Sequence, residues 1–269
     1  MLHDAIPVPL EDVEWLYARD ESYAVHDGVE LRLQLIFPYH PQLPDDAGFP
    51  LILFLPGAAW YRQEMYNSVP QWAKLAERGA VVAAVQVRSS QEAKYPAQVE
   101  DALAAMYHLA ADAARWHIDP HRMYLCGQSS GGHIALMTVL TSMDELAAAP
   151  DFTLRGVIAV SAPTDMQRCG GQPSLDLLGL SDLTEDPARV MAASCGGYIT
   201  PAAPLPRMLL IHGTADEVVP MTHSQQLYRQ LTAAGKRVHF IKVSGAGHGG
   251  AWQWKDQLLD SMMQFVCEG

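Results

Sequence analysis

The segment Tyr124-Leu-Cys-Gly-Gln-Ser129-Ser-Gly-Gly-His133 places a serine between glycines, where a strand is expected to give way to a helix. The apolar run 123–126 predicts a buried strand, and residues 134–140 predict the start of a helix. A G-x-S-x-G motif in this context indicates a nucleophile elbow, a tight turn that presents a serine hydroxyl above a sheet, near a helix N-terminus. Only Ser129 fits this frame, because the frame for Ser130 would need a glycine at position 128.

Two other interpretations of this segment are a Gly/Ser-rich turn that simply packs and a phosphate-binding loop. A P-loop requires Gly-Lys-Ser/Thr in its second half, and a dinucleotide fingerprint requires G-x-G-x-x-G. The segment contains neither pattern. We therefore favour Ser129 as a nucleophile.

A serine hydroxyl needs a histidine base, and the base needs a carboxylate that orients it. Asp216 follows the predicted strand 208–211, and His248 follows the predicted strand 238–243. Both lie where loops at strand C-terminal ends form sites in open α/β sheets. We predict a Ser129–His248–Asp216 triad.

Other roles remain open for the acidic residues near these strand ends. Asp216 could be a turn or cap residue before the predicted helix 221–234. Asp165 also ends a strand and is the competing acid, although a role at the cap hinge or in substrate contact fits it better. His212 precedes the turn that contains Asp216 and is expected to order that loop.

The tetrahedral intermediate of acyl transfer needs backbone N–H donors that point at its oxyanion. One donor is expected from Ser130, the residue after the nucleophile. The others are expected from Gly57, Ala58 and Ala59, which follow the predicted strand 51–55. Trp60 and Tyr61 come next and are predicted to contribute to the wall of the substrate pocket.

The remaining pattern indicates an α/β protein. Alternating residues 22–37 around Asp27-Gly28 predict a hairpin, a Pro-rich loop follows from Pro38 to Gly48, and buried strands then alternate with helical segments. This order predicts a mostly parallel eight-stranded sheet with helices on both faces. Further strands are expected at 80–87 and 154–160, and further helices at 68–78, 97–115 and 258–266.

One connection is long. Residues 165–206 are rich in Gly, Pro and Ala, with a helical piece near 175–178. An insertion of this length within a compact domain is usually functional, so we expect a small cap over the strand ends. We expect one domain over residues 1–269 that includes this cap.

Composition narrows the class of protein. The net charge of −12 argues against nucleic acid or an anionic membrane as a partner. No apolar run reaches the 18 or so residues of a membrane span, and no secretion signal is visible, so we expect a cytoplasmic protein. A homo-oligomer is compatible with the sequence. The four cysteines lack C-x-x-C spacing, so we expect free thiols and no metal site; they are Cys126, Cys169, Cys195 and Cys267.

The chain resembles the α/β-hydrolase superfamily, and within it the esterase/lipase group of hormone-sensitive-lipase-like carboxylesterases, acetyl xylan and feruloyl esterases, and kynurenine formamidases. The resemblance covers roughly residues 50–255. Its motifs are Pro56-Gly-Ala-Ala-Trp60, Tyr95-Pro-Ala-Gln-Val-Glu-Asp101, Gly127-Gln-Ser-Ser-Gly-Gly-His133, His212-Gly-Thr-Ala-Asp-Glu-Val-Val-Pro220 and Gly247-His248-Gly249.

This resemblance implies the α/β-hydrolase fold and a cofactor-free serine hydrolase with Ser129, Asp216 and His248 as its triad. The chain departs from the family in the oxyanion loop, which usually begins His-Gly-Gly. Here Pro56 replaces the histidine, and Ala58 and Ala59 replace glycines. Alanine keeps its N–H, but it disfavours positive φ angles.

We therefore predict a serine carboxylesterase for a small-molecule ester with a short acyl group, with acetyl esters of carbohydrates as candidate substrates. An amidase or formamidase, such as an N-formylkynurenine hydrolase, would use the same triad. A non-catalytic binding protein is the alternative from another class, because a fold alone does not establish a function.

Overall fold

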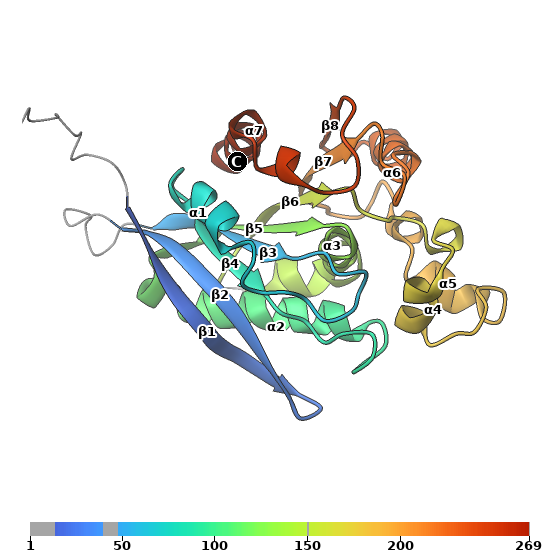
Figure 1. Ribbon diagram of the computed structural model, residues 1–269, viewed down its shortest axis with the longest axis horizontal. Coiled ribbons are helices and arrows are strands. Elements are labelled where there is room, and N and C mark those ends of the chain that lie inside the picture. The colour runs from blue at the N-terminus through green and yellow to red at the C-terminus, as the bar shows by residue number, and fades with distance from the viewer. Residues whose placement is uncertain (1–13, 40–47, 150, 269) are drawn as a thin grey trace, which may run out of the picture.

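The computed structural model describes residues 14–39, 48–149 and 151–268. Most of the predicted Pro-rich loop 38–48 lies outside these residues. The described chain forms one eight-stranded sheet in the order β1-β2-β4-β3-β5-β6-β7-β8. From β4 to β8 all neighbouring strands are parallel, and β1 and β2 add an antiparallel edge. The predicted α/β fold class is confirmed (Figure 1).

The strands follow the predicted order along the chain. Two of them have the predicted bounds, β6 (Leu154–Val160) and β8 (Val238–Val243). The others are β1 (Glu14–His26), β2 (Val29–Tyr39), β3 (Phe49–Leu55), β4 (Val81–Val85), β5 (Ile118–Gln128) and β7 (Arg207–Gly213).

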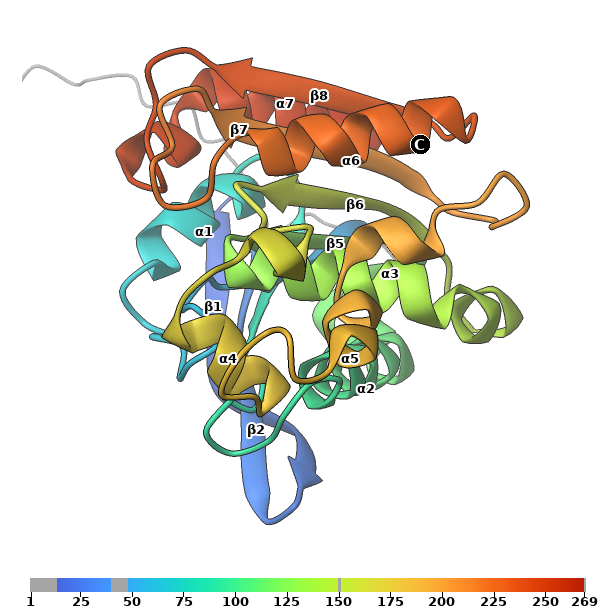
Figure 2. The same cartoon turned by 90° about the vertical axis from the view of Figure 1, so that its right-hand side faces the viewer.

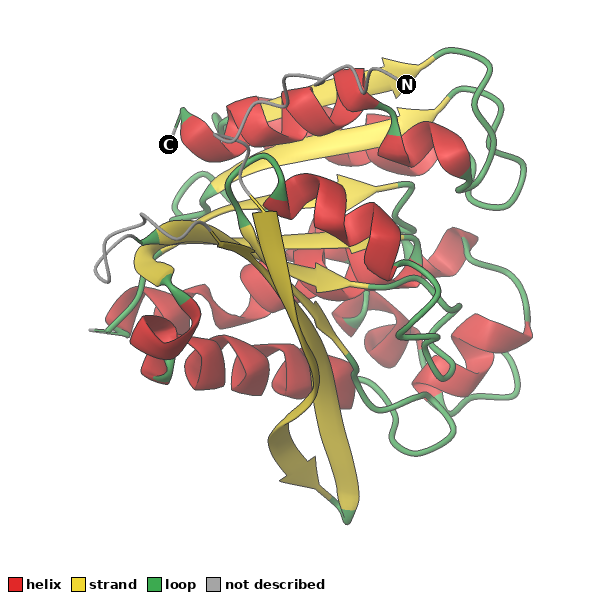
Figure 3. Ribbon diagram, turned by 60° about the vertical axis from the view of Figure 1, so that its left-hand side comes forward, coloured by secondary structure: helices red, strands yellow, loops and turns green. Residues whose placement is uncertain are grey.

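The hairpin between β1 and β2 turns at Asp27 and Gly28, whose φ angles are 52° and 79°. Two consecutive positive φ angles are those of the tight turns that match strand twist. The tip of this hairpin extends beyond the rest of the sheet (Figure 1). Figure 3 shows the twist of the whole sheet between its helices.

Helices cover both faces of the sheet (Figure 2). One face packs against α1 (Val69–Ala76) and α7 (Asp256–Cys267). The other face packs against α2 (Ala97–Ala111), α3 (Ser130–Ala148) and α6 (Thr222–Ala233). Successive residues of a strand point to opposite faces, so Leu51 and Leu53 of β3 join one core, while Ile52 and Phe54 join the other.

The predicted helix 97–115 is interrupted. Helix α2 ends at Ala111, and a 3₁₀ turn, η1 (Ala113–Trp116), follows. Asp112 separates them with φ −97° and ψ 16°, outside helical geometry. Apolar spacing continues across this break, which explains why the sequence pattern predicted one helix.

The long insertion between β6 and β7 contains four short helical pieces. They are η2 (Met166–Arg168), α4 (Gln172–Leu178), α5 (Pro187–Ala192) and η3 (Cys195–Tyr198). The loop after β3 contacts this insertion, because the Tyr61 hydroxyl donates a hydrogen bond to Asp176 of α4 at 2.6 Å. The structure therefore places the insertion beside the loop that was predicted to hold an oxyanion.

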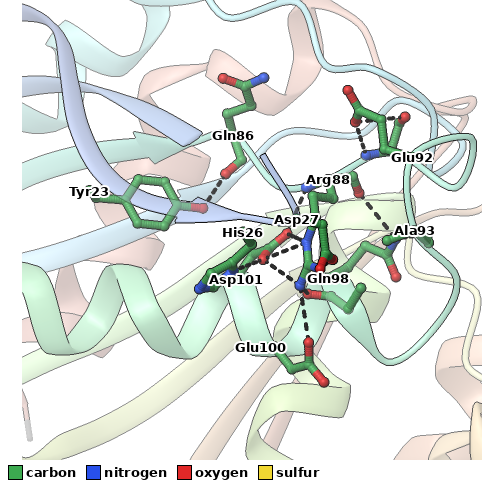
Figure 4. Close-up of polar contacts among 12 residues, drawn as sticks. Tyr23, His26, Asp27, Gln86, Arg88, Glu92, Ala93, Gln98, Glu100 and Asp101 are labelled. Carbon is green, nitrogen blue, oxygen red and sulfur yellow. Dashed lines mark hydrogen bonds and ion pairs between the residues drawn. The ribbon is translucent and has the colours of Figure 1, made fainter. Parts of the chain in front are cut away.

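An ionic cluster with a buried centre joins the hairpin to α2 (Figure 4). We call it the Arg88 cluster; its residues are Arg88, Asp101, His26, Asp27 and Glu100. Arg88 and Asp101 are both buried, and their side chains pair at 2.8 Å. Asp101 also accepts a hydrogen bond from the Arg88 backbone N–H and lies 2.7 Å from His26 Nδ1. The cluster fixes the position of the hairpin on the sheet.

Within the described residues, no helix combines the length and apolarity needed to cross a membrane.

Candidate active site

Ser129 lies at the sharp turn between β5 and α3. Its φ is 54° and its ψ is −124°, a backbone conformation that residues other than glycine rarely adopt. A Cβ atom on Gly131 would lie 2.0 Å from the Leu55 carbonyl oxygen, and one on Gly127 would lie 2.3 Å from the Gly131 carbonyl oxygen. Both motif glycines are therefore required sterically, and strain at the serine matches a nucleophile elbow.

His248 connects the serine to the acid. Its Nε2 lies 2.9 Å from Ser129 Oγ, and its Nδ1 lies 2.8 Å from Asp216 Oδ2. The three residues lie in or next to the turns that follow β5, β7 and β8. The structure thus brings together the three side chains predicted to form the triad, at one end of the sheet.

The Asp216 side chain is completely buried, and its charge is held by hydrogen bonds. Its Oδ1 accepts from the backbone N–H groups of Val218 at 3.0 Å and Val219 at 2.9 Å. Burial alone would raise the pKa of Asp216, but the hydrogen bonds from His248 and Val219 outweigh it and lower the pKa below its ordinary value. The carboxylate therefore remains ionised and can hold a proton on His248 Nδ1.

His212 orders the acid loop, as its position indicated. The ring is buried, with Nδ1 2.8 Å from Ser224 Oγ and Nε2 2.8 Å from the Val219 carbonyl oxygen. Burial lowers the pKa of His212, so it is neutral at pH 7. The competing acid Asp165 caps η2 instead, where it accepts from the Gln167 N–H at 3.1 Å.

The oxyanion loop approaches the elbow closely. A Cβ atom on Gly57 would lie 2.7 Å from the Gln128 carbonyl oxygen, so this position requires glycine. Ala58 donates its N–H to Ser130 Oγ at 3.0 Å. Among the described residues, the N–H groups of Ser130 and Ala59 have no acceptor, which leaves them available to an oxyanion.

Two residues of this loop adopt the left-handed conformation although neither is a glycine. Ala59 has φ 51° and Trp60 has φ 60°. Such angles are unfavourable for residues with a Cβ, so contacts elsewhere must hold the loop. Trp60 is buried, and its carbonyl oxygen accepts from the Ser90 N–H at 2.7 Å.

A histidine that the sequence analysis did not select supports this loop. The Trp60 indole Nε1–H donates to His133 Nδ1 at 3.1 Å, and His133 Nε2–H donates to the Ala193 carbonyl oxygen at 2.8 Å. His133 is fully buried, and burial lowers its pKa to about 4. This neutral imidazole joins the oxyanion loop, α3 and the insertion. Its place in Gly131-Gly132-His133 was visible, but the contacts were not.

A cavity of about 180 Å³ adjoins Ser129. Three regions line it: the oxyanion loop with Ala59 and Trp60, the insertion, and the turn after β7. The insertion contributes Arg168, Cys169, Gly170, Pro173 and Ser174, and the turn and α6 contribute Val218, Val219, Pro220 and His223. Trp60 therefore lies where a pocket wall was predicted, whereas Tyr61 directs its hydroxyl to Asp176.

Two titratable groups in this wall are uncharged at neutral pH. Burial raises the pKa of the Cys169 thiol to about 12, so Cys169 is not a reactive thiolate. Burial lowers the pKa of His223 to about 4, and its Nδ1 accepts from the Thr164 N–H at 3.1 Å. Among the described residues, no group of three or more His, Cys, Asp or Glu side chains is arranged to hold a metal ion.

The chain is similar in sequence to curated esterases. The chain is 26% identical over 223 residues to a probable isoprenylcysteine alpha-carbonyl methylesterase of Oryza sativa subsp. japonica, covering 74% of this chain and 50% of that protein. It is 23% identical over 214 residues to the esterase LipC of Mycobacterium tuberculosis, covering 74% and 53%. The chain thus spans about half the length of these curated relatives.

Solved structures agree on the fold. A truncated carbohydrate esterase from gut microbiota superposes with a TM-score of 0.81 at 26% identity, over 97% of this chain and 98% of that one. A native thermophilic esterase of Thermogutta terrifontis superposes with a TM-score of 0.74 at 25% identity, over 97% and 94%. The sequence model of the BD-FAE family matches residues 38–231. The protein therefore belongs to the BD-FAE family, in the esterase/lipase group of the α/β-hydrolase superfamily.

Proposed function

We propose that the protein is a serine carboxylesterase that hydrolyses short-chain acyl esters through Ser129, His248 and Asp216. The observation that carries this proposal is the position of His248, which lies within hydrogen-bonding distance of both the serine hydroxyl and the buried carboxylate. The esterase names of its relatives and structural neighbours support the same class of reaction.

In this mechanism Asp216 accepts the Nδ1–H of His248, which leaves Nε2 free to accept the hydroxyl proton of Ser129. Ser129 Oγ attacks the ester carbonyl carbon, and the proton moves to His248. The resulting oxyanion accepts hydrogen bonds from the N–H groups of Ser130 and Ala59. His248 then returns the proton to the leaving alcohol, and the C–O bond to that alcohol breaks.

Water then hydrolyses the acyl-enzyme, taking the place that the Ser129 hydroxyl had in the first step. His248 takes a proton from water, the hydroxide attacks the acyl carbonyl carbon, and Ser129 leaves with the proton from His248. These steps use only side chains, backbone donors and water.

The cavity beside Ser129 supports a short acyl group. Its volume of about 180 Å³ is below the range of pockets that hold drug-sized ligands, roughly 300–1,000 Å³. Long lipid chains would not fit in it. Acetyl esters of carbohydrates are the substrates we propose to test first, because a structural neighbour with a TM-score of 0.81 is a carbohydrate esterase.

The test is the initial rate of hydrolysis of p-nitrophenyl acetate, butyrate and octanoate by the wild type and by Ser129→Ala. We expect rapid turnover of acetate, slower turnover of longer chains, and a loss of about 10⁵- to 10⁶-fold in kcat for the variant. Ser129→Ala should keep its fold by circular dichroism, because it removes one hydroxyl at the turn. A variant that retained most of its activity would disprove Ser129 as the nucleophile.

A second reagent separates an inactive protein from one with a different substrate. A fluorophosphonate probe should label Ser129 in the wild type and leave Ser129→Ala unlabelled. A folded wild type that turned over none of the esters would overturn the esterase proposal. Labelling without ester turnover would then direct the search to amide substrates.

A further inference from the structure

The wall of the cavity beside Ser129 has one permanent charge. Among the described residues that line the cavity, Arg168 alone is charged at all ordinary pH values. The other polar lining side chains are hydroxyls, a neutral thiol, the Trp60 indole and the neutral His223 imidazole. A substrate in this cavity therefore meets a wall with a single guanidinium.

Arg168 is exposed, and its side chain is held by uncharged partners. It donates from Nη1 to Gln226 Oε1 and from Nη2 to Thr222 Oγ1, both at 3.0 Å and both uncharged acceptors of α6. Among the described residues, no carboxylate forms an ion pair with it. Asp165, three residues earlier, caps η2 and lines a different cavity.

Among the described residues, Arg155 and Arg207 also lack an ion pair, but Arg168 is the arginine that lines the cavity beside Ser129. Other arginines are neutralised. Arg88 pairs with three carboxylates, and Arg78 pairs with Asp256 and Asp260. In a protein with a net charge of −12, carboxylates are abundant. The two bonds to α6 orient the Arg168 guanidinium and leave further N–H groups for an acceptor that enters the cavity.

We propose that Arg168 binds a carboxylate of the substrate, so that the preferred substrates are small esters that carry a negative charge. This inference rests on the proposed esterase function. A guanidinium matches a carboxylate in geometry and forms two parallel N–H···O bonds with it. The carboxylate can belong to the acyl group or to the alcohol; a sugar acid with an acetyl ester satisfies both this inference and the carbohydrate substrate proposed above.

The test compares matched pairs of anionic and neutral esters, with product acid measured by pH-stat titration. Monomethyl succinate carries its charge on the acyl side, and methyl pentanoate is its neutral counterpart. O-Acetylglycolate carries its charge on the alcohol side, and propyl acetate is its neutral counterpart. In at least one pair we expect kcat/KM of the wild type to be about 10-fold higher for the anionic ester, since a hydrogen bond to a charged group contributes about that much.

Two variants assign this preference to Arg168. Arg168→Gln should remove the preference by raising KM for the anionic ester, whereas Arg168→Lys should keep part of it because the charge remains. Arg189→Gln is the matched control: Arg189 belongs to the same insertion but is near Asp186 and donates to the Leu178 carbonyl oxygen. This control should leave the anionic-to-neutral ratio unchanged.

The outcomes separate the two proposals. If neutral esters are hydrolysed at least as fast as anionic ones in both pairs, and Arg168→Gln does not alter the ratio, Arg168 only attaches the insertion to α6 and the inference is wrong. In that case the esterase function still stands. If a folded wild type hydrolyses p-nitrophenyl acetate but none of the four esters, the inference alone fails. If it hydrolyses neither p-nitrophenyl esters nor these four, the esterase function and the inference fail together.

Discussion

Two histidine–carboxylate pairs of the described residues have nearly equal lengths and opposite surroundings; a third contact, from His212 Nε2 to Asp216 at 3.3 Å, is longer. His248 Nδ1 lies 2.8 Å from Asp216, and His26 Nδ1 lies 2.7 Å from Asp101; both carboxylates are fully buried. Asp101 also pairs with Arg88, and no serine hydroxyl is bonded to His26 among the described residues (Figure 4). Asp216 is held by two backbone N–H groups, and its histidine reaches Ser129.

The difference explains why we propose a catalytic role for only one of the two pairs. The charge of Asp101 is neutralised by the Arg88 guanidinium, so Asp101 would stabilise an imidazolium only weakly. The charge of Asp216 has only dipolar partners, so it can stabilise the imidazolium that forms during catalysis. The first pair contributes to stability, and we assign the second to chemistry.

Asp216→Asn tests the catalytic pair and should have the largest effect. An amide that donates to Nδ1 would hold the wrong imidazole tautomer, so we expect kcat to fall by about 10⁴-fold. The free energy of unfolding should change by only about 1 kcal/mol, since the amide oxygen can still accept from Val218 and Val219. Ester hydrolysis and urea unfolding measure the two effects, and a larger kcat loss in Asp165→Asn would transfer the acid role to Asp165.

Asp101→Asn is the corresponding change in the Arg88 cluster. It should lower the stability strongly and leave kcat almost unchanged. Removing one partner of a buried ion pair leaves Arg88 with only its two more exposed carboxylates, so we expect a destabilisation of about 3 kcal/mol. The kcat of the folded fraction should stay within about 2-fold of the wild type. If kcat fell as far as in Asp216→Asn, the division between the two pairs would not hold.

The buried imidazole of His133, which supports the oxyanion loop, should make the free energy of unfolding fall at acidic pH. Its pKa is about 4 in the folded state and 6.5 when unperturbed, so between these values the unfolded chain binds the extra proton. The neutral imidazole therefore contributes stability above pH 6.5 that is lost as the pH falls to 4, about 3 kcal/mol in all. His133→Gln should flatten this part of the profile in urea titrations from pH 7 to 4. An unchanged slope would contradict the assignment.

His26→Gln should have the smallest effect. About a third of the His26 side chain is exposed, and Asp101 keeps Arg88 as its partner. We expect a change below about 1 kcal/mol in unfolding free energy and no change in kcat. His248→Gln, by comparison, should abolish turnover. Thermal unfolding and ester hydrolysis on both variants complete the contrast between the two pairs.

The sequence predicted the strands along the chain, the turn at Ser129 and the loops that hold Asp216 and His248, because each depends on local chemistry, whereas the order of the strands within the sheet was not predicted. Gly127 and Gly131 are required by steric contacts, and Asp216 and His248 follow apolar runs that form strands. The positive φ of Ala59 was not predictable, because alanine avoids it unless distant contacts impose it.

The contacts of the insertion were also hidden from the sequence. Helix α4 contains the helical piece predicted near 175–178, but α4 and α5 are only seven and six residues long, so a periodic pattern cannot define their bounds. Arg168 meets Thr222 and Gln226 more than fifty residues further along the chain. Nothing near Arg168 in the sequence indicates that this exposed guanidinium lines a cavity.

The distribution of the triad over the chain has a consequence for folding. His248 lies 119 residues after Ser129, and it follows β8, which is the last strand of the described chain and lies at an edge of the sheet. Contacts of such long range form only when the intervening chain is in place. Under the proposed mechanism, turnover therefore reports completion of folding: in a refolding experiment, activity should return only when β8 has docked, even if the local β1–β2 hairpin forms much earlier.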